Sequence, residues 1–212
     1  PVSTVALIRH DRFAIRQTVE IKLDGQGHMP QPVHVPIDWK VIDWSPSDTW
    51  KGTTLPALIA KGANPKLIKR CVYVIRLDGN FCVRYPKGES PVVYVGEGKF
   101  GGRITSHRKW AAELEELVQK SSFQVCVASP RVRNNEDAYR DCEAALLQRF
   151  AKKFHSAPLW NKQFEKRRFL HYQYSQRQLD YALCKRSGAK YKWAIQPMRA
   201  SMFYGTYGRT HV

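Results

Sequence analysis

The chain has 212 residues and a formal net charge of +17, because 35 lysines and arginines outnumber 18 aspartates and glutamates. Hydrophobic residues make up 43% of it, enough for one domain with a real core, and no apolar run is long enough to span a bilayer. The composition therefore excludes a transmembrane helix. It indicates a polyanion as partner, DNA or RNA before an anionic membrane, and charge that serves only solubility is the alternative.

Residues 1–70 are irregular in pattern. They hold alternating apolar runs near residues 2–8 and 19–23, followed by prolines that alternate with three tryptophans, Trp39, Trp44 and Trp50. A disordered tail would be poor in tryptophan, so we expect short strands and ordered loops here. A short helix is expected to open at Pro56 and to end near Gly62.

From residue 71 the pattern becomes regular. β-Branched and aromatic runs predict strands at residues 71–75, 81–83, 91–95 and 123–127. Apolar stripes at three- and four-residue spacing predict helices at 103–119 and 136–154, and a further short helix is expected at 176–185. Asn134 or Asn135 is expected to cap the helix at 136–154.

The order strand, strand, helix, strand, helix predicts an α+β fold. Its centre is a small, mainly antiparallel, three-stranded sheet flanked by helices. We expect an N-terminal elaboration at 1–70, a core at 71–165, and a basic, aromatic C-terminal segment at 166–212 that serves DNA binding or dimerisation.

Cysteine usage indicates a reducing compartment. The five cysteines form no Cys-x-x-Cys pair and no cluster with histidine at zinc-ligand spacing, so a structural zinc site is not expected. Because no signal peptide is visible, we expect a cytoplasmic protein. Cys71, Cys126 and Cys142 fall in apolar patterns and are expected in the core.

Arg103 and His107 are four residues apart and therefore share one face of the predicted helix. Farther along the helix that face is apolar, so two polar residues at its start, beside four glycines, indicate a cleft. The alternative is an ordinary half-exposed arginine and a core histidine whose hydrogen bonds are satisfied.

Glu143 lies in the apolar stripe of the following helix. A buried carboxylate is unfavourable unless it is paired or bound to a metal. Without histidine or cysteine on the same face, it is a hard oxygen ligand that suits Mg²⁺, which takes one or two carboxylates plus substrate phosphate and keeps most of its waters. The alternative is a salt bridge to Arg103 or Arg140.

Tyr73 and Tyr94 lie on predicted strands, where tyrosine is common and serves packing. A phenol can also accept a proton or orient a nucleophile when a cation lowers its pKa, and Lys99 is close enough in sequence to contribute. Asn161 follows Pro158 and is also consistent with an ordinary turn residue.

The order and spacing of these residues resemble the GIY-YIG nuclease family. The matching segments are a GIY-like triplet, a YIG-like triplet, an Arg/His helix start, a glutamate and a late turn: Cys71-Val72-Tyr73, Tyr94-Val95-Gly96, Arg103-Ile104-Thr105-Ser106-His107, Glu143 and Pro158-Leu159-Trp160-Asn161. The resemblance covers about residues 71–165. Cys71 replaces the first glycine, and the longer gap between the tyrosines implies an inserted hairpin near 78–91. The Arg/His pair is similar to the restriction and homing endonuclease branches.

This resemblance implies hydrolysis of phosphodiester bonds with one divalent metal, Mg²⁺ or Mn²⁺. It implies that Glu143 holds the metal and that Arg103 stabilises the extra negative charge of the pentacoordinate state. Tyr73, with His107, would deprotonate or orient the attacking water. Tyr94 would bond to phosphate or water.

The resemblance also implies that Asn161 holds a loop or the leaving side. The candidate substrate-binding residues are Gly96, Lys99 and Arg108. The expected function is a metal-dependent endonuclease that acts on double-stranded DNA as a sequence-specific restriction-type enzyme.

Residues 162–212 support the expected DNA contact, because 11 lysines and arginines against 2 acidic residues are interleaved there with aromatic side chains. The flanks leave room for groove readout and for a homodimer interface, and no membrane partner is expected. Other functions stay open: a nonspecific DNase such as a toxin, a non-catalytic nucleic-acid-binding protein on a nuclease scaffold, and a basic structural or ribosome-associated protein.

Overall fold

The structure is a computed structural model that describes residues 31–118, 123–162, 165–183, 191–200 and 204. The apolar runs near residues 2–8 and 19–23 lie outside these ranges, as do the last residues of the helix expected at 176–185. Most of the segment after residue 200 also lies outside them.

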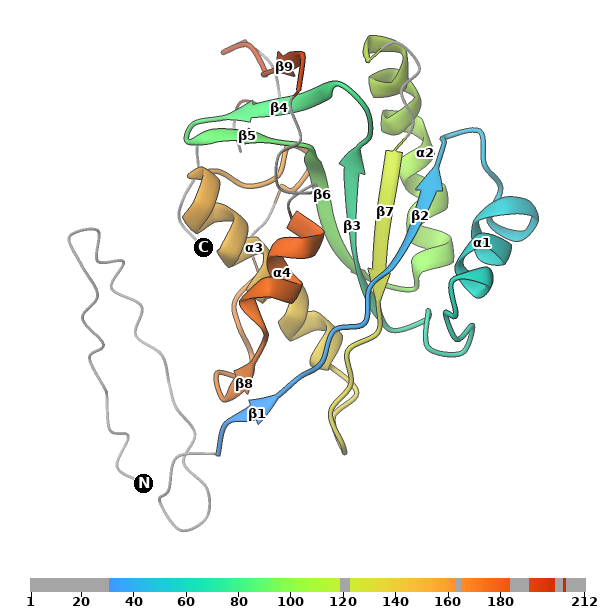
Figure 1. Ribbon diagram of the computed structural model, residues 1–212, viewed down its shortest axis with the longest axis vertical. Coiled ribbons are helices and arrows are strands. Elements are labelled where there is room, and N and C mark those ends of the chain that lie inside the picture. Colours follow the sequence, from blue (N-terminus) through green and yellow to red (C-terminus); the bar gives the residue numbers. More distant parts are fainter. Residues whose placement is uncertain (1–30, 119–122, 163–164, 184–190, 201–203, 205–212) are drawn as a thin grey trace, which may run out of the picture.

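The architecture is α+β, and its centre is a four-stranded antiparallel sheet in the order β2-β7-β3-β6 (Figure 1). Its strands, in that order, are β2 (Lys40–Trp44), β7 (Phe123–Ala128), β3 (Cys71–Leu77) and β6 (Val92–Gly98). β3, β6 and β7 lie where the β-branched and aromatic runs predict strands. The pairing of β3 with both β6 and β7 makes it the buried centre of the sheet, and all seven of its residues are buried.

The predicted three-stranded sheet is wrong by one strand. β2 comes from the segment expected to precede the core, and it pairs with β7 in a register that places Trp44 opposite Phe123. Ile42 and Trp44 alternate along β2 and are both buried, so they extend the apolar face of the sheet. Pairing β2 with β7 also covers an edge that would otherwise expose unpaired backbone groups.

Two smaller sheets contain the remaining strands, including those of the flanking segments. The hairpin expected near 78–91 is present as β4 (Phe81–Tyr85) and β5 (Gly88–Ser90). Strand β9 (Trp193–Ile195) pairs in parallel with β4, and β1 (Val33–His34) pairs in parallel with β8 (Tyr172–Gln173). The C-terminal segment thus pairs with the core through β9 and with the N-terminal segment through β8.

The helices are α1 (Leu55–Ala60), α2 (Phe100–Leu117), α3 (Ala138–Phe154) and α4 (Gln176–Leu183), and a π-helical turn, η1 (Trp50–Thr54), leads into α1. α1 has a proline in its first turn and is followed by Gly62 at a φ of +79°. The cap predicted for α3 is wrong. Asp137 occupies the cap position, and the Asn135 side chain accepts a hydrogen bond from the Asp137 amide at 2.8 Å, which closes the preceding turn.

Side chains alternate across the sheet, and this decides which helix each of them can reach. Tyr73 contacts His107 of α2 on one face. Gly96 pairs with Tyr73, and the next residue, Glu97, therefore points to the other face, where it meets Arg140 of α3. β6 ends at Gly98 and α2 begins at Phe100, so the end of β6 that carries Glu97 adjoins the start of α2.

Three cysteines expected in the core, Cys71, Cys126 and Cys142, are fully buried free thiols. Within the described ranges, no helix combines the length and the apolar character needed to cross a membrane.

Candidate functional site

Tyr73 and His107 form a buried hydrogen bond that joins β3 to α2. The Tyr73 hydroxyl lies 2.8 Å from Nε2 of His107, and Nε1 of Trp110 donates to Nδ1 of the same ring at 3.0 Å. An indole N–H can only donate, so Nδ1 is the acceptor and the proton of the neutral imidazole is on Nε2, where it donates to Tyr73. His107 is thus a core histidine with both nitrogens satisfied. One of its partners is the tyrosine of the GIY-like triplet.

Burial sets the ionisation of this pair. Burial, and after it the charge of Arg103, lowers the pKa of His107 to about 4, so the ring is neutral near pH 7. Burial raises the pKa of Tyr73 well above its ordinary value, Tyr94 adds to the rise, and Arg103 opposes it. Additional positive charge nearby is therefore what would bring the Tyr73 phenol toward ionisation.

Tyr94 lies beside both of these residues because Gly96 has no side chain. The Tyr94 ring centroid is 4.5 Å from that of His107 and 5.9 Å from that of Tyr73. A Cβ at Gly96 would lie 2.5 Å from Cε1 of Tyr94 and 2.8 Å from the Tyr73 hydroxyl, closer than real Cβ atoms approach. The candidate substrate-binding glycine therefore lies directly against the two tyrosines and permits their close approach.

Arg103 connects the separate parts of the site. Its side chain is exposed, and its Nε donates to the Glu97 carbonyl at a long 3.4 Å. Its positive charge lowers the pKa values of four residues on four different elements, which are Tyr73, Tyr94, His107 and Glu143. An exposed guanidinium so placed can contact an anionic ligand while acting on every other member of the group.

Glu143 is a buried carboxylate on α3, with 9% of its surface exposed. In the described part of the chain no hydrogen bond or ion pair reaches it, so neither salt bridge weighed from the sequence is formed. Arg140 instead pairs with Asp137 at 3.4 Å and loosely with Glu97 at 3.9 Å. The charge of Glu143 is thus left without a direct partner.

The surroundings of Glu143 disfavour its charged form. Burial, followed by the neighbouring carboxylates of Glu97 and Glu165, raises its pKa to about 8, and Arg103 and Arg168 act in the opposite direction. A bound cation would reverse this balance.

Glu97 is a second carboxylate at this position, and sequence reasoning missed it. Its Oε2 is buried without a hydrogen-bond partner, and so is Nε of Arg140, the cation nearest to it. The available signal was its position directly after the YIG-like triplet, where a charged residue continues an apolar strand. Alternation along β6 turns it away from Tyr94 and toward α3.

The acidic residues fit a hard divalent cation. Carboxylate oxygens are protein ligands that Mg²⁺ and Mn²⁺ accept, and Glu97 is near enough for its charge to raise the pKa of Glu143. Among the residues that the structure describes, no group of three or more histidine, cysteine, aspartate or glutamate side chains could hold a metal ion. Two carboxylates with water in the remaining positions form a ligand set that Mg²⁺ commonly takes.

Asn161 lies at the edge of β6 and bonds to Val95, the residue between Tyr94 and Gly96. Its Nδ2 donates to the Val95 carbonyl at 2.7 Å, and its Oδ1 accepts from the Val95 amide at 2.9 Å. The Trp160 amide donates to the Val93 carbonyl at 3.0 Å. The turn at 158–161 therefore covers the outer edge of β6 as a neighbouring strand would.

The two basic candidates for substrate binding lie in different surroundings. Lys99 is exposed at the cap position of α2, four residues before Arg103 along the chain. Arg108 is half-buried, and its Nε donates to the Pro46 carbonyl at 2.5 Å. Arg108 thus joins α2 to the N-terminal part of the chain and has no described contact with the tyrosines or glutamates.

Comparisons with known proteins add nothing to this geometry, since no protein-family model matches the chain and no curated protein or solved structure was found to match it. The arrangement of Tyr73, Tyr94, Arg103, His107 and Glu143 is therefore interpreted from its own chemistry. The resemblance to the GIY-YIG family stays a hypothesis.

Proposed function

We propose that this protein is a metal-dependent endonuclease of the GIY-YIG type that hydrolyses phosphodiester bonds of double-stranded DNA. The observation that supports it best is a single exposed arginine, Arg103, whose charge acts on two tyrosines, a neutral histidine and an unpaired buried carboxylate. A buried carboxylate without a partner destabilises a fold. Packing gives no reason to keep one beside an arginine, whereas cleavage of a phosphodiester does.

In the proposed reaction, nearby positive charge lowers the pKa of the Tyr73 phenol, which first loses its own proton to solvent. The phenolate then orients the attacking water and accepts its proton, while the new P–O bond forms and the P–O bond to the leaving oxygen breaks. The Nε2–H of His107 stabilises the phenolate through the 2.8 Å hydrogen bond. Trp110 keeps the proton on Nε2 by donating to Nδ1. Tyr94, whose ring packs on His107, offers its hydroxyl to the water or to a phosphate oxygen.

Arg103 neutralises the charge that accumulates on the phosphorus oxygens in the pentacoordinate state. Glu143 would hold the divalent cation, with Glu97 beside it. A bound Mg²⁺ or Mn²⁺ supplies Lewis-acid polarisation of the scissile phosphate.

Restriction-type specificity is the second part of the proposal, and the flanking segments support it. β2 extends the central sheet and β9 extends the hairpin, so both flanks lie on the core and can present side chains to a DNA groove. The net charge of +17 suits the phosphate backbone. A nonspecific DNase is the alternative within the same chemistry.

Incubation of the protein with phage-sized linear DNA and Mg²⁺, followed by gel electrophoresis, tests both parts. Discrete fragments support a sequence-specific enzyme, and a smear supports a nonspecific one. A parallel reaction with EDTA should leave the DNA intact. DNA that is retarded but never cut, with either Mg²⁺ or Mn²⁺, would contradict the proposed activity and would favour a non-catalytic DNA-binding protein.

A further inference from the structure

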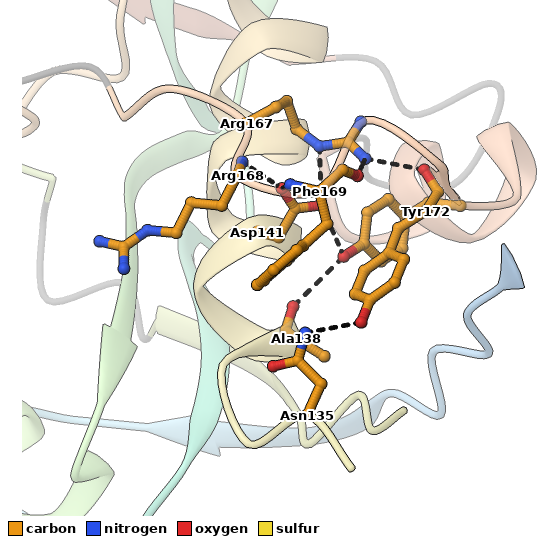
Figure 2. Close-up of polar contacts among 8 residues, drawn as sticks. Asn135, Ala138, Asp141, Arg167, Arg168, Phe169 and Tyr172 are labelled. Carbon is orange, nitrogen blue, oxygen red and sulfur yellow. Dashed lines mark hydrogen bonds and ion pairs between the residues drawn. The ribbon is translucent and has the colours of Figure 1, made fainter. Parts of the chain in front are cut away.

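Asp141 fixes the segment that follows the core onto α3, and Figure 2 shows the contacts. Its carboxylate is fully buried and accepts from Nε of Arg167 at 2.8 Å, from the hydroxyl of Tyr174 at 3.0 Å, and from the amides of Arg168 and Phe169 at 2.6 and 2.9 Å. All of these donors belong to one short stretch of chain. Asp141 therefore determines where the backbone of Arg168 lies.

The side chain of Arg168 leaves this cluster. Figure 2 shows its guanidinium directed away from Asp141, with only the backbone amide of the residue joined to the carboxylate. The residue is exposed, and no described side chain forms an ion pair with it. Its charge nevertheless acts on Glu143, on the same helix as Asp141. The neighbouring Arg167 already forms hydrogen bonds within the cluster. Its Nε donates to Asp141, and its Nη2 donates to the carbonyls of Phe169 and Tyr172 at 3.0 and 2.7 Å.

We propose that Arg168 is a second substrate-binding arginine of the site, which contacts a DNA phosphate next to the one held at Glu143 and Arg103. A guanidinium can bind a phosphate through two parallel hydrogen bonds, and a fixed backbone lowers the entropy lost on binding. Four hydrogen bonds to one buried carboxylate are a strong attachment for an exposed loop. The loop thereby holds Arg168 against α3, the helix that carries Glu143 two residues beyond Asp141, and leaves its guanidinium directed away from the cluster.

This inference rests on the proposed function, and the test separates the two. Arg168→Ala is compared with Arg168→Lys and with Lys152→Ala, which removes an exposed charge from the far end of α3. Each variant keeps the backbone amide that Asp141 binds, so folding should be unchanged. Single-turnover cleavage is measured at saturating protein with Mg²⁺, and DNA affinity is measured in EDTA as a function of salt.

Arg168→Ala should lower the saturating cleavage rate by roughly 10- to 100-fold, because it removes a charge-assisted contact beside the reacting phosphate. It should also make the negative slope of log K against log[salt] shallower by about 0.9. Arg168→Lys should keep the slope and recover part of the rate, and Lys152→Ala should leave the rate unchanged.

A wild-type enzyme that cleaves DNA, with Arg168→Ala indistinguishable from Lys152→Ala, would overturn this inference and leave the proposed function standing. A wild-type protein that binds but never cleaves would overturn the proposed function, and the salt slopes would then still decide whether Arg168 contacts phosphate.

Discussion

The hydroxyl of Tyr73 lies 2.8 Å from Nε2 of His107, and this contact places a strand residue and a helix residue 34 positions apart at one buried point beside an exposed arginine. A hydrogen bond in this place has two possible purposes. It can hold α2 on the sheet, or it can stabilise a phenolate during proton transfer. The two purposes differ in what the loss of one oxygen atom does.

Tyr73→Phe should lower single-turnover cleavage by roughly 10²- to 10⁴-fold, the range for a lost general base, with DNA affinity retained. The ring and its packing remain, but the buried Nε2–H of His107 loses its acceptor, so the fold should be destabilised by about 1–3 kcal/mol. Cleavage and thermal unfolding of the same preparations check both expectations.

Tyr85→Phe is the matched control for this substitution. The Tyr85 hydroxyl donates to the Val92 carbonyl at 2.6 Å and accepts from the Leu159 amide at 3.0 Å, away from the site. Its loss leaves two backbone groups unpaired, against one histidine N–H in Tyr73→Phe, so the control should be at least as destabilised as Tyr73→Phe, and the folded molecules should still cleave DNA. Full activity in Tyr73→Phe would remove that residue from the mechanism.

His107 should make the fold sensitive to mild acid. Its pKa is about 4 in the folded protein against 6.5 in the unfolded chain, so between these values the unfolded state binds more protons. The contribution of His107 to the free energy of unfolding is therefore fully present above about pH 6.5 and is lost as the pH falls. Between pH 7 and pH 5 this residue alone should lower the free energy of unfolding by about 2 kcal/mol.

Urea unfolding of the wild type and of His107→Gln at both pH values measures this contribution. Glutamine does not titrate, so the stability difference between the two proteins should shrink by about 2 kcal/mol on going from pH 7 to pH 5. A difference that is equal at the two pH values would show that His107 is not held neutral in the fold.

Gly96→Ala should impair the site through geometry alone. The added Cβ would lie 2.8 Å from the Tyr73 hydroxyl, and the neighbouring tyrosine ring would be closer still, so the tyrosines must move. A displacement near 1 Å can lower a rate by about 10²-fold, and cleavage should fall by that order.

Gly102→Ala is its control, because Gly102 is an exposed residue of α2 and a Cβ there would meet nothing within 4 Å. Alanine should stabilise that helix by up to about 1 kcal/mol without an effect on cleavage. If both alanine variants cleave at the wild-type rate, the close approach of the tyrosines has no catalytic meaning.

Much of this fold follows from local pattern. β3, β6, β7, α2 and α3 each carry their own period of apolar residues, and each lies close to its expected position. β2 and β9 could not be assigned in this way, because strands of five and three residues do not specify a distant partner. Their positions depend on which sheet edges remain open once the core has formed.

The candidate site also contains residues that the sequence indicates and residues that only the structure reveals. Tyr73, Arg103 and Glu143 are identifiable from the order of residue types along the chain. Trp110 and Glu97 are not, because a tryptophan in an apolar helix stripe and a glutamate at a strand end acquire their roles only from neighbours in space. Trp110 fixes the histidine tautomer, and Glu97 places a second carboxylate near the first.

Arg103→Ala should lower the cleavage rate by roughly 10²-fold or more, which is typical for the loss of one group that stabilises transition-state charge. Its effect on DNA affinity should be small. Lys109→Ala, another exposed cation on α2, is the control and should cleave normally. An Arg103→Ala variant that loses affinity but cleaves at the wild-type rate when saturated would make Arg103 a phosphate-positioning residue.

Glu143→Gln tests the central claim most directly, because it keeps the shape of the side chain and removes its capacity to hold a divalent cation. Single-turnover cleavage, DNA affinity in EDTA and the shift of the melting temperature with added Mg²⁺ are measured for the variant and the wild type. The account predicts that the wild type cleaves only with metal and melts at a higher temperature as Mg²⁺ is added. The variant should bind DNA equally well but show neither cleavage nor the shift. Substantial Mg²⁺-dependent cleavage by Glu143→Gln would contradict the account.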